Sequence, residues 1–261
     1  MVEEAAKQKR LPWFPVVMLH RITETTPEDN FYSLCISQDN LARIIHILRS
    51  SGYEIVTFED AFAAWQRGES IQRKACLTFD DGYQDFYTHA VPVLERLECP
   101  ASVYVVTDRL GGTNTWDAHQ LPEVRLMTRE QVKDVVAKGF EVGVHSATHP
   151  HLHQLLQRYR EPEIAGAKRE LENLLDKPAD VYAYPYWDQN EDVRAEVEAA
   201  GFKAALGGEQ PEHEPFLVYR CDFKSLNGLS IRLKIGGWHH RAVHNRPVRM
   251  MRWVAHVALR R

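Results

Sequence analysis

The stretch ACLTFDDGY, residues 75–83, joins a short apolar run directly to two carboxylates and a glycine. The run 75–79 has the length and the composition of a buried β-strand. Asp80 and Asp81 then lie at the carboxyl end of that strand, where Gly82 permits a sharp turn. Adjacent carboxylates repel each other unless a cation is shared, although an ordinary Asp-Gly turn with solvated acids is the alternative interpretation.

Strand-like and helix-like segments alternate along most of the chain. Helical periodicity is clearest in residues 37–52, where Ser37 can cap the helix and Gly52 can end it. The predicted strands are residues 14–19, 53–58, 75–79, 101–106, 140–144, 181–184 and 202–206. The predicted helices are residues 37–52, 60–68, 84–98, 128–139, 161–176 and 192–201. Such alternation predicts parallel βαβ units, and therefore a barrel or a doubly wound sheet.

Length and composition favour one large domain. The chain has 261 residues, of which 44% are apolar, and this is enough for one core of barrel size. Its four cysteines form no CxxC pair, so neither a zinc knuckle nor a disulfide framework is indicated. The apolar run LPWFPVVML (11–19) is too short for a signal peptide core or a membrane span, so we expect a cytoplasmic protein.

The charges of the chain are unevenly distributed. Nine Lys and Arg residues, and no Asp or Glu, follow Asp222. Because the whole chain carries a formal charge of -4 and this tail carries +9, residues 1–222 carry -13. We therefore expect a flexible segment at 1–14, a barrel-like domain at 15–222, and a basic segment at 223–261 that contains an amphipathic helix.

Potentially reactive side chains follow four of the predicted strands. His20 follows the first strand, Asp80 and Asp81 follow ACLTF, His145 follows FEVGV, and Tyr186 follows VYAY. Barrels and open sheets of the α/β class keep their sites at the carboxyl ends of parallel strands. We therefore expect these side chains to converge in the folded protein.

The segment HSATH supplies two histidines four positions apart, His145 and His149. This spacing places two imidazoles on one side of a tight turn, as zinc sites require. The segment HHRAVH offers a rival pair, His240 and His244, but no carboxylate follows Asp222 to complete a site locally. HSATH is therefore the better candidate for a pair of metal ligands.

Three segments together resemble the motifs of the polysaccharide deacetylase family, which is also called carbohydrate esterase family 4 or the nodulation-deacetylase homology group. LTFDDGY (77–83), VGVHSATHPHL (142–152) and AYPYW (183–187) are similar to its first three motifs. The resemblance covers residues 16–206. It implies an α/β fold, a distorted (β/α) barrel of about seven parallel strands.

The resemblance also implies an activity and its residues. The family's members are metal-dependent hydrolases of a linear amide bond, which remove an N-acetyl or similar small acyl group from an amino sugar. Asp80 would be the general base, while Asp81, His145 and His149 would hold one divalent metal ion, usually zinc. The metal and the backbone N–H of Tyr186 would stabilise the oxyanion.

The general acid of most family members is a histidine from a late motif, and no convincing copy of that motif follows residue 206. In the biofilm poly-N-acetylglucosamine deacetylase branch the motif order is circularly permuted, and a histidine after the first strand takes this role. MLHRI (18–22) is similar to that arrangement, so His20 is the candidate acid. A histidine that merely caps the first strand is the alternative.

Two positions depart from the family pattern. Ala183 stands where the third motif carries an arginine that orients the catalytic aspartate, and Trp187 stands where glycine is usual. Arg220, near another strand end, is a candidate replacement, and a surface or ion-pairing arginine is the alternative. Trp116 lies in the long loop 108–127 and is a candidate for stacking on a sugar, although loop tryptophans equally often anchor a loop to the core.

The basic tail bears on the substrate and the location. Arg249, Arg252, His256 and Arg260 share one face of a predicted helix, which either packs on the barrel or contacts anionic lipid. Lipid contact would suit a lipid-linked amino sugar at the inner face of the membrane. No nucleic-acid-binding module is recognisable. The alternatives to a sugar deacetylase are a non-catalytic carbohydrate-binding relative and a metal amidohydrolase that acts on a non-sugar amide.

Overall fold

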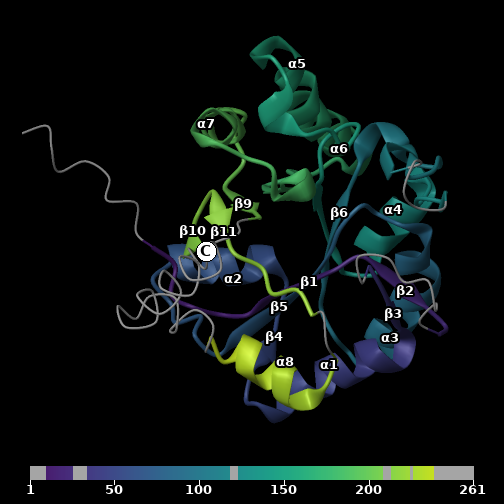
Figure 1. Cartoon of the computed structure of the whole chain (residues 1–261), viewed down its shortest axis with the longest axis vertical. Helices are drawn as coiled ribbons and strands as arrows, with labels where there is room; N and C mark the ends of the chain where they lie inside the picture. Colours follow the sequence, from purple (N-terminus) through teal and green to yellow (C-terminus); the bar gives the residue numbers. More distant parts are fainter. Residues whose placement is uncertain (1–9, 26–33, 118–122, 208–212, 224–225, 238–261) are drawn as a thin grey trace, which may run out of the picture.

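A curved sheet forms the centre of the molecule, and helices lie around it (Figure 1). The computed structural model describes residues 10–25, 34–117, 123–207, 213–223 and 226–237. Seven parallel strands follow one another across the sheet: β1 (Val16–Leu19), β5 (Lys74–Phe79), β6 (Ser102–Val105), β7 (Glu141–Val144), β8 (Val181–Ala183), β9 (Ala204–Leu206) and β11 (Leu217–Val218). The predicted α/β class and distorted barrel of parallel strands are thereby confirmed.

The sheet curls so that its first strand and the segment after β11 are joined by backbone hydrogen bonds. Cys221, just beyond β11, pairs in parallel with Val17 of β1. The Cys221 N–H donates to the Val16 carbonyl at 2.6 Å, and the Met18 N–H donates to the Cys221 carbonyl at 2.9 Å. The first strand and the segment after the last parallel strand are therefore neighbours.

Four short strands complete the β-structure of the described residues. β4 (Glu54–Ile55) pairs in parallel with β5, and β10 (His213–Glu214) is antiparallel to β11. β2 (Arg21–Thr23) and β3 (Cys35–Ser37) form a separate parallel pair. β4 is shorter than the predicted strand 53–58, because the Thr57 hydroxyl accepts a hydrogen bond from the Asp60 N–H and starts a helix at Phe58.

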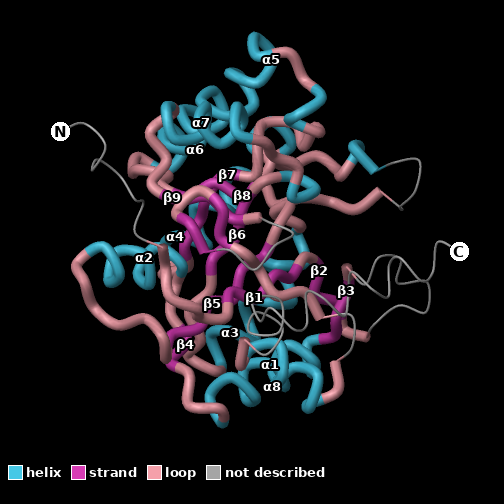
Figure 2. Tube along the Cα trace, turned by 60° about the vertical axis from the view of Figure 1, so that its left-hand side comes forward, coloured by secondary structure: helices cyan, strands magenta, loops and turns pink. Residues whose placement is uncertain are grey.

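Helices surround the strands (Figure 2), and polar caps mark where several of them begin. Their bounds are α1 (Gln38–Ser50), α2 (Phe58–Gln66), α4 (Arg129–Ala137), α7 (Glu191–Ala199) and α8 (Gly228–Ile235). The predicted cap Ser37 accepts from the Asn40 N–H at 3.2 Å, which confirms the start of α1. Thr128 and Gln131 form a capping box at the start of α4.

Two segments predicted as continuous helices are interrupted near a proline. In residues 84–98, the π-helical turn η2 (Phe86–Ala90) precedes the short helix α3 (Val91–Arg96). In the second segment, the π-helical turn η6 (Pro162–Gly166) joins α5 (Gln157–Glu161) to α6 (Ala167–Leu175). Proline lacks a backbone N–H and its ring crowds the preceding turn, so a widened turn accommodates it.

Successive strand residues face two apolar clusters, as the two-residue period of a strand requires. The inner cluster includes Val16, Cys76, Tyr104 and Val181 together with Phe58 of α2. The outer cluster lies between the sheet and the helices and includes Val17, Leu77, Val103, Tyr182 and the apolar face of α1. Side chains near the carboxyl ends of the strands are therefore fixed by packing on both sides of the sheet.

The two ends of the described chain pack on the body of the protein. Leu11 and Phe14, in the predicted N-terminal segment 1–14, are buried in the inner cluster. α8, in the predicted basic segment 223–261, packs on α1. The predicted amphipathic helix with Arg249, Arg252, His256 and Arg260 lies outside the described residues. Within the described part, none of the helices has both the length and the apolarity needed to cross a bilayer.

Candidate active site

The carboxyl ends of the parallel strands bring together the predicted site residues. Asp80 and Asp81 follow β5, and His145 follows β7. His20 follows β1, whose last residue pairs with the last residue of β5. Arg220 lies between β11 and the hydrogen bonds that join Cys221 to β1. The site is thus built from strands that are neighbours in the sheet but distant in the sequence.

Asp81, His145 and His149 converge in a buried cluster. The Asp81 Oδ1 lies 3.3 Å from the His145 Nε2 and 3.2 Å from the His149 Nε2. One ligand atom from each of the three side chains lies within 4.8 Å of the other two. All three residues are buried. Among the described residues, this is the group of histidines and carboxylates with the arrangement of a metal site.

The chemistry of this cluster fits a divalent cation. The His145 Nδ1 is 2.8 Å from the Ala183 carbonyl, which can only accept, so Nδ1 carries a proton. In the neutral imidazole the Nε2 lone pair then faces the Asp81 carboxylate, and two acceptors face each other unless a cation lies between them. Burial works to raise the pKa of Asp81, but the neighbouring His145 and His149 rings outweigh it and hold that pKa well below its usual value.

Asp80, beside this cluster, forms a two-point ion pair with Arg220. The Arg220 Nη1 donates to the Asp80 Oδ1 and the Arg220 Nη2 donates to the Asp80 Oδ2, both at 2.6 Å. Arg220 is fully buried, and its Nη1 also lies 3.4 Å from the Thr78 hydroxyl. Arg220 thus lies against Asp80, the residue that the missing arginine at Ala183 would orient. Of the two alternatives for Arg220, a surface position is not what the structure has, whereas an ion pair is present and its partner is Asp80.

Charge around Asp80 keeps its carboxyl group ionised despite burial. Burial works to raise the pKa of Asp80, but Arg220, His145 and His20 outweigh it and lower that pKa. His20 also lowers the pKa of Asp81, so its ring lies within electrostatic reach of both carboxylates. The Asp80 N–H donates to the Leu19 carbonyl at 2.9 Å. His20 therefore directly follows a residue that is hydrogen-bonded to Asp80.

The loops of the site hold unusual backbone conformations. Seven non-glycine residues of the described chain have positive φ, and five of them lie in the three motif loops: Asp81, Ser146, His149, Tyr186 and Trp187. Such conformations cost about 1–3 kcal/mol each and persist where the surrounding structure imposes them. The positive φ of 57° at Trp187 is consistent with the glycine that is usual at this position.

Aromatic rings line one side of the cluster. The Trp116 ring stacks on the His149 ring with centroids 4.6 Å apart, and the Tyr186 ring contacts His149 edge-on at 4.5 Å. The His151 ring stacks on the outer side of Tyr186 at 4.0 Å. We call the rings of Trp116, Tyr186 and His151 the aromatic wall. Tyr186 is 43% exposed, so this wall is open to solvent at one end. Trp116 is therefore next to the candidate ligands, and its loop is anchored there at the same time.

Several residues near the site were not predicted as part of it. Glu163 bonds to the loop between His145 and His149, and Asp85 accepts hydrogen bonds from the Arg21 side chain at 2.9 Å and the Ile22 N–H at 3.2 Å. Neither is marked by spacing, because each lies on a helical turn remote from its partner in the sequence.

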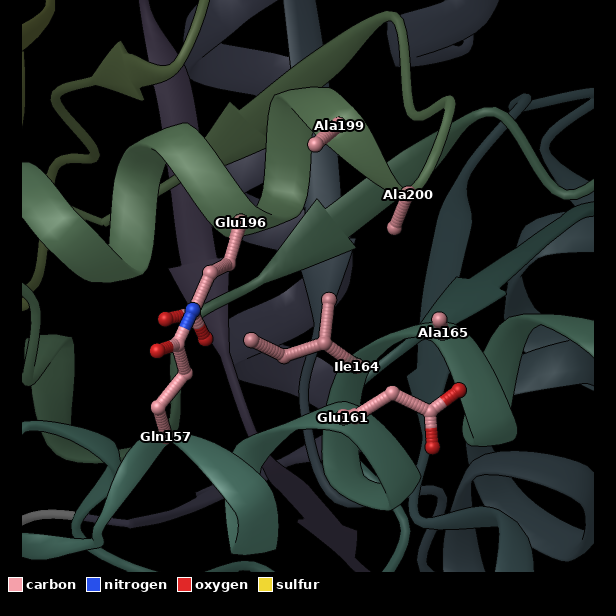
Figure 3. Close-up of a pocket in the computed structure, with 7 residues that line it drawn as sticks. All are labelled: Gln157, Glu161, Ile164, Ala165, Glu196, Ala199 and Ala200. Carbon is pink, nitrogen blue, oxygen red and sulfur yellow. The ribbon is translucent and has the colours of Figure 1, made fainter.

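A separate surface pocket lies among the helices α5, η6 and α7 (Figure 3). Its volume is about 260 Å³. It is lined by Gln157, Glu161, Ile164, Ala165, Glu196, Ala199 and Ala200. None of these residues belongs to the candidate site at the strand ends, so we assign the chemistry to the strand ends and not to this pocket.

Fold and site together define an α/β-barrel protein with a candidate metal site at the carboxyl ends of its strands. The family model of polysaccharide deacetylase matches residues 67–205. The chain therefore belongs to the polysaccharide deacetylase family, as its motifs predicted.

Individual relatives agree with this assignment. YxkH of Bacillus subtilis, which carries a polysaccharide deacetylase name, is 25% identical over 193 residues, or 74% of this chain and 63% of YxkH. A poly-β-1,6-N-acetyl-D-glucosamine N-deacetylase of Staphylococcus aureus is 23% identical over 194 residues, or 69% of this chain and 63% of the relative. This chain thus aligns with less than two thirds of the length of either relative.

The fold has close counterparts among solved structures. The structure of IcaB from Ammonifex degensii superposes with a TM-score of 0.67 and 22% identity, and the match covers 85% of this chain and 97% of that one. At this identity the likeness establishes the shared barrel fold.

Proposed function

We propose that this protein is a metal-dependent hydrolase that removes an N-acetyl, or similar small acyl, group from an amino sugar in a saccharide. The observation that carries the proposal is the buried set of Asp81, His145 and His149 directly beside the ion-paired Asp80. A protein that only binds sugar has no need of this set. Membership of the polysaccharide deacetylase family supports the same reaction.

Asp81, His145 and His149 would hold one divalent ion, zinc in this proposal, because one carboxylate and two imidazoles are a usual zinc donor set. When bound, such an ion acts as a Lewis acid and lowers the pKa of water toward about 7. The hydrogen bond from the His145 Nδ1 to the Ala183 carbonyl fixes the tautomer in which Nε2 can bind the ion.

Asp80 acts as the general base and accepts a proton from the attacking water at a carboxylate oxygen. Arg220 fixes the plane of that carboxylate by holding both of its oxygens at 2.6 Å. Each oxygen keeps a further lone pair that can accept the proton. The lowered pKa of Asp80 means that the base is in its ionised form near neutral pH.

His20 acts as the general acid and gives a proton to the amine nitrogen as the amide bond breaks. It lies at the end of β1, next to the strand end that carries Asp80. The backbone N–H of Tyr186 donates a hydrogen bond to the oxygen that gains negative charge. The base and the acid thus come from two adjacent strands of the sheet, and the oxyanion donor comes from a third.

The aromatic wall gives the site a surface for a sugar. Sugar rings stack on aromatic side chains, and Trp116 and Tyr186 both present rings beside His149. The Staphylococcus aureus relative is named for poly-β-1,6-N-acetyl-D-glucosamine, and an N-acetylated glucosamine saccharide is the substrate class we propose.

Release of acetate tests the proposed reaction. The zinc-loaded protein is incubated with N-acetylated monosaccharides, oligosaccharides, lipid-linked sugars and simple non-sugar amides, and acetate and free amine are measured. We expect release from a saccharide, loss of release with a chelator, and recovery on addition of zinc. Asp80→Asn is the matched inactive variant. Sugar binding without release would instead indicate a carbohydrate-binding relative, and release from non-sugar amides alone would indicate a different amidohydrolase.

A second part of the proposal concerns location. We propose a cytoplasmic enzyme whose basic C-terminal segment contacts anionic lipid at the inner face of the membrane, where a lipid-linked amino sugar would be met. The support is the row of Arg249, Arg252, His256 and Arg260 in the sequence, and each basic residue near an anionic surface contributes about 1 kcal/mol. Salt-sensitive flotation with anionic vesicles that is lost on truncation after Asn245 is expected. Absence of binding by the intact chain at low salt would refute this part.

A further inference from the structure

Glu163 lies outside the three family motifs, but its carboxylate is directed at one of them. Its Oε2 accepts hydrogen bonds from the Ala147 N–H at 3.0 Å and from the Thr148 N–H at 2.8 Å. Its Oε1 accepts a third bond from the Thr148 hydroxyl at 2.6 Å. Both donor residues stand between His145 and His149, so the carboxylate holds the middle of the HSATH loop.

The HSATH loop needs such support because its backbone is strained. Ser146 has a φ of 65° and His149 has a φ of 68°, both in the left-handed region that disfavours residues with a side chain. The 3-10 turn η3 (Thr107–Arg109), just after β6, binds the carbonyls of this loop. The Thr107 N–H donates to the Ser146 carbonyl at 3.1 Å and the Asp108 N–H donates to the Ala147 carbonyl at 3.0 Å. Glu163 binds the N–H groups, so the loop is held from two opposite sides.

The surroundings of Glu163 make a role for it in packing alone a poor explanation. Its side chain is buried, and it forms no ion pair with any described Lys, Arg or His. A buried carboxylate without a cation is costly, and the three hydrogen bonds that Glu163 accepts from side-chain and backbone donors of the loop offset this cost. It lies in the π-helical turn η6, a type of turn that occurs frequently at functional sites.

We propose that Glu163 is a positioning residue for the candidate metal site. By binding both N–H groups in the centre of the loop, it holds the left-handed conformation at His149, and thereby keeps the His149 imidazole directed at Asp81. The inference rests on the proposed function, because it concerns the residues that would hold the metal. It assigns to a helix outside the barrel strands part of the control of metal affinity.

Three variants separate hydrogen bonding from charge and from general stability. Glu163→Ala removes all three bonds. Glu163→Gln can keep them, because the amide oxygen can accept from both N–H groups while the amide nitrogen donates to the Thr148 hydroxyl. Glu196→Ala is the matched control, since it breaks a two-point ion pair to Arg160 in the neighbouring helix α5 without contacting the loop.

Two measurements are made on the full chain, and neither needs catalytic activity. The first is the zinc dissociation constant by competition with a chromophoric chelator, and the second is hydrogen exchange of the Thr148 amide in zinc-free protein. We expect Glu163→Ala to weaken zinc binding roughly 10- to 100-fold, the usual effect of losing a residue that supports a metal ligand. Thr148 exchange should accelerate by about tenfold or more as the loop opens locally. Glu163→Gln and Glu196→Ala should stay within about threefold of the wild type in zinc affinity, since both keep the bonds to the loop.

Specific results would overturn the inference. Glu163→Ala with the zinc affinity and Thr148 protection of the wild type would show that the contact positions nothing. Equal losses in Glu163→Ala and Glu196→Ala would reduce the effect to general destabilisation, and a Gln variant as weak as the Ala variant would remove hydrogen bonding as the cause. If the wild type itself binds no zinc, the proposed function fails. The exchange measurement is made on zinc-free protein, so it still tests whether Glu163 holds the loop.

Discussion

Arg220 and Asp80 lie 140 positions apart in the chain and are joined by two hydrogen bonds of 2.6 Å in the interior of the barrel. Both side chains are buried, at 0% and 2% exposure. The arginine comes from the segment that closes the sheet and the aspartate from the strand that carries the first motif. In the family pattern an arginine of the third motif orients the catalytic aspartate. In this chain Ala183 stands at that position, and Arg220, which follows β11, contacts Asp80 instead.

Loss of this ion pair is the first prediction. Arg220→Met leaves a buried carboxylate without its cation, which typically costs about 3–5 kcal/mol of stability. We expect the variant to have a lower free energy of unfolding by urea and to lose acetate release. Arg160→Met removes another two-point pair, to Glu196 outside the site, and should reduce stability while leaving kcat unchanged. Full turnover in a folded Arg220→Met protein would exclude Arg220 as the residue that orients Asp80.

The second prediction concerns His20. His20→Ala should lower kcat by roughly 10²- to 10⁴-fold, the usual contribution of a general acid, with zinc content and unfolding unchanged. His46→Ala, at an exposed position of α1, is the control and should have the activity of the wild type. Steady-state assays of both variants decide the matter. A His20→Ala enzyme as active as the control would mean that the acid is another group.

Gly82 provides the third prediction, because two separate constraints require glycine there. Its φ is +71°, and a Cβ at this position would lie 2.9 Å from the Val105 Cγ1. Gly82→Ala should therefore cost the left-handed strain, about 1 kcal/mol, and in addition about 1–3 kcal/mol for overpacking. Gly139→Ala has a φ of +88° and no atom within 4 Å of the new Cβ, so it should show the strain alone. Urea unfolding of both variants measures the difference, and equal losses would contradict the close contact.

The fourth prediction is a pH dependence of stability that arises at Glu141. Burial, and then repulsion from Glu59, raise the pKa of Glu141 to about 8 from an ordinary value of 4.5. Because the folded pKa is the higher one, the contribution of this group is fully present below the unfolded pKa and is lost as the pH rises through about 8. Stability should therefore fall between these two values, by up to about 1.4 kcal/mol per pH unit.

Glu141→Gln should remove this slope. The Gln carbonyl can keep the hydrogen bond from the Glu59 N–H, which is 2.7 Å long in the wild type, and its amide can donate to the Tyr104 hydroxyl. Urea unfolding of both proteins at several pH values across this range is the measurement. A wild-type curve parallel to that of the variant would show that Glu141 does not titrate in this range.

The alternation of strands and helices was readable from the sequence because each element carries its own period. A helix cap such as Ser37 forms with residues that are neighbours in the sequence. The helix α1 was therefore predicted almost to its ends. The π-helical turns were missed, since the pattern of apolar residues continues through them. The convergence of Asp81, His145 and His149 followed from the rule that parallel strands end on the same side of a sheet.

Other features of the site depend on contacts that no local pattern encodes. The pairing of Arg220 with Asp80 requires closure of the sheet, so the sequence could offer Arg220 as one of two equal interpretations and no more. The three bonds from the HSATH loop to Glu163 depend on where an outer helix lies relative to β7. The positive φ of His149 follows from these contacts and not from the residue type.

The hydrogen bonds between Cys221 and β1 also set an order of events during synthesis. A nascent chain that has emerged only as far as β9 already contains Asp80, Asp81 and both histidines of HSATH, but not the guanidinium of Arg220. Its Asp80 would remain without a counter-ion, a state in which a carboxylate either takes up a proton or keeps its water. The ion pair of Asp80 with Arg220 can therefore form only after residue 221 has left the ribosome and the two edges of the sheet have met.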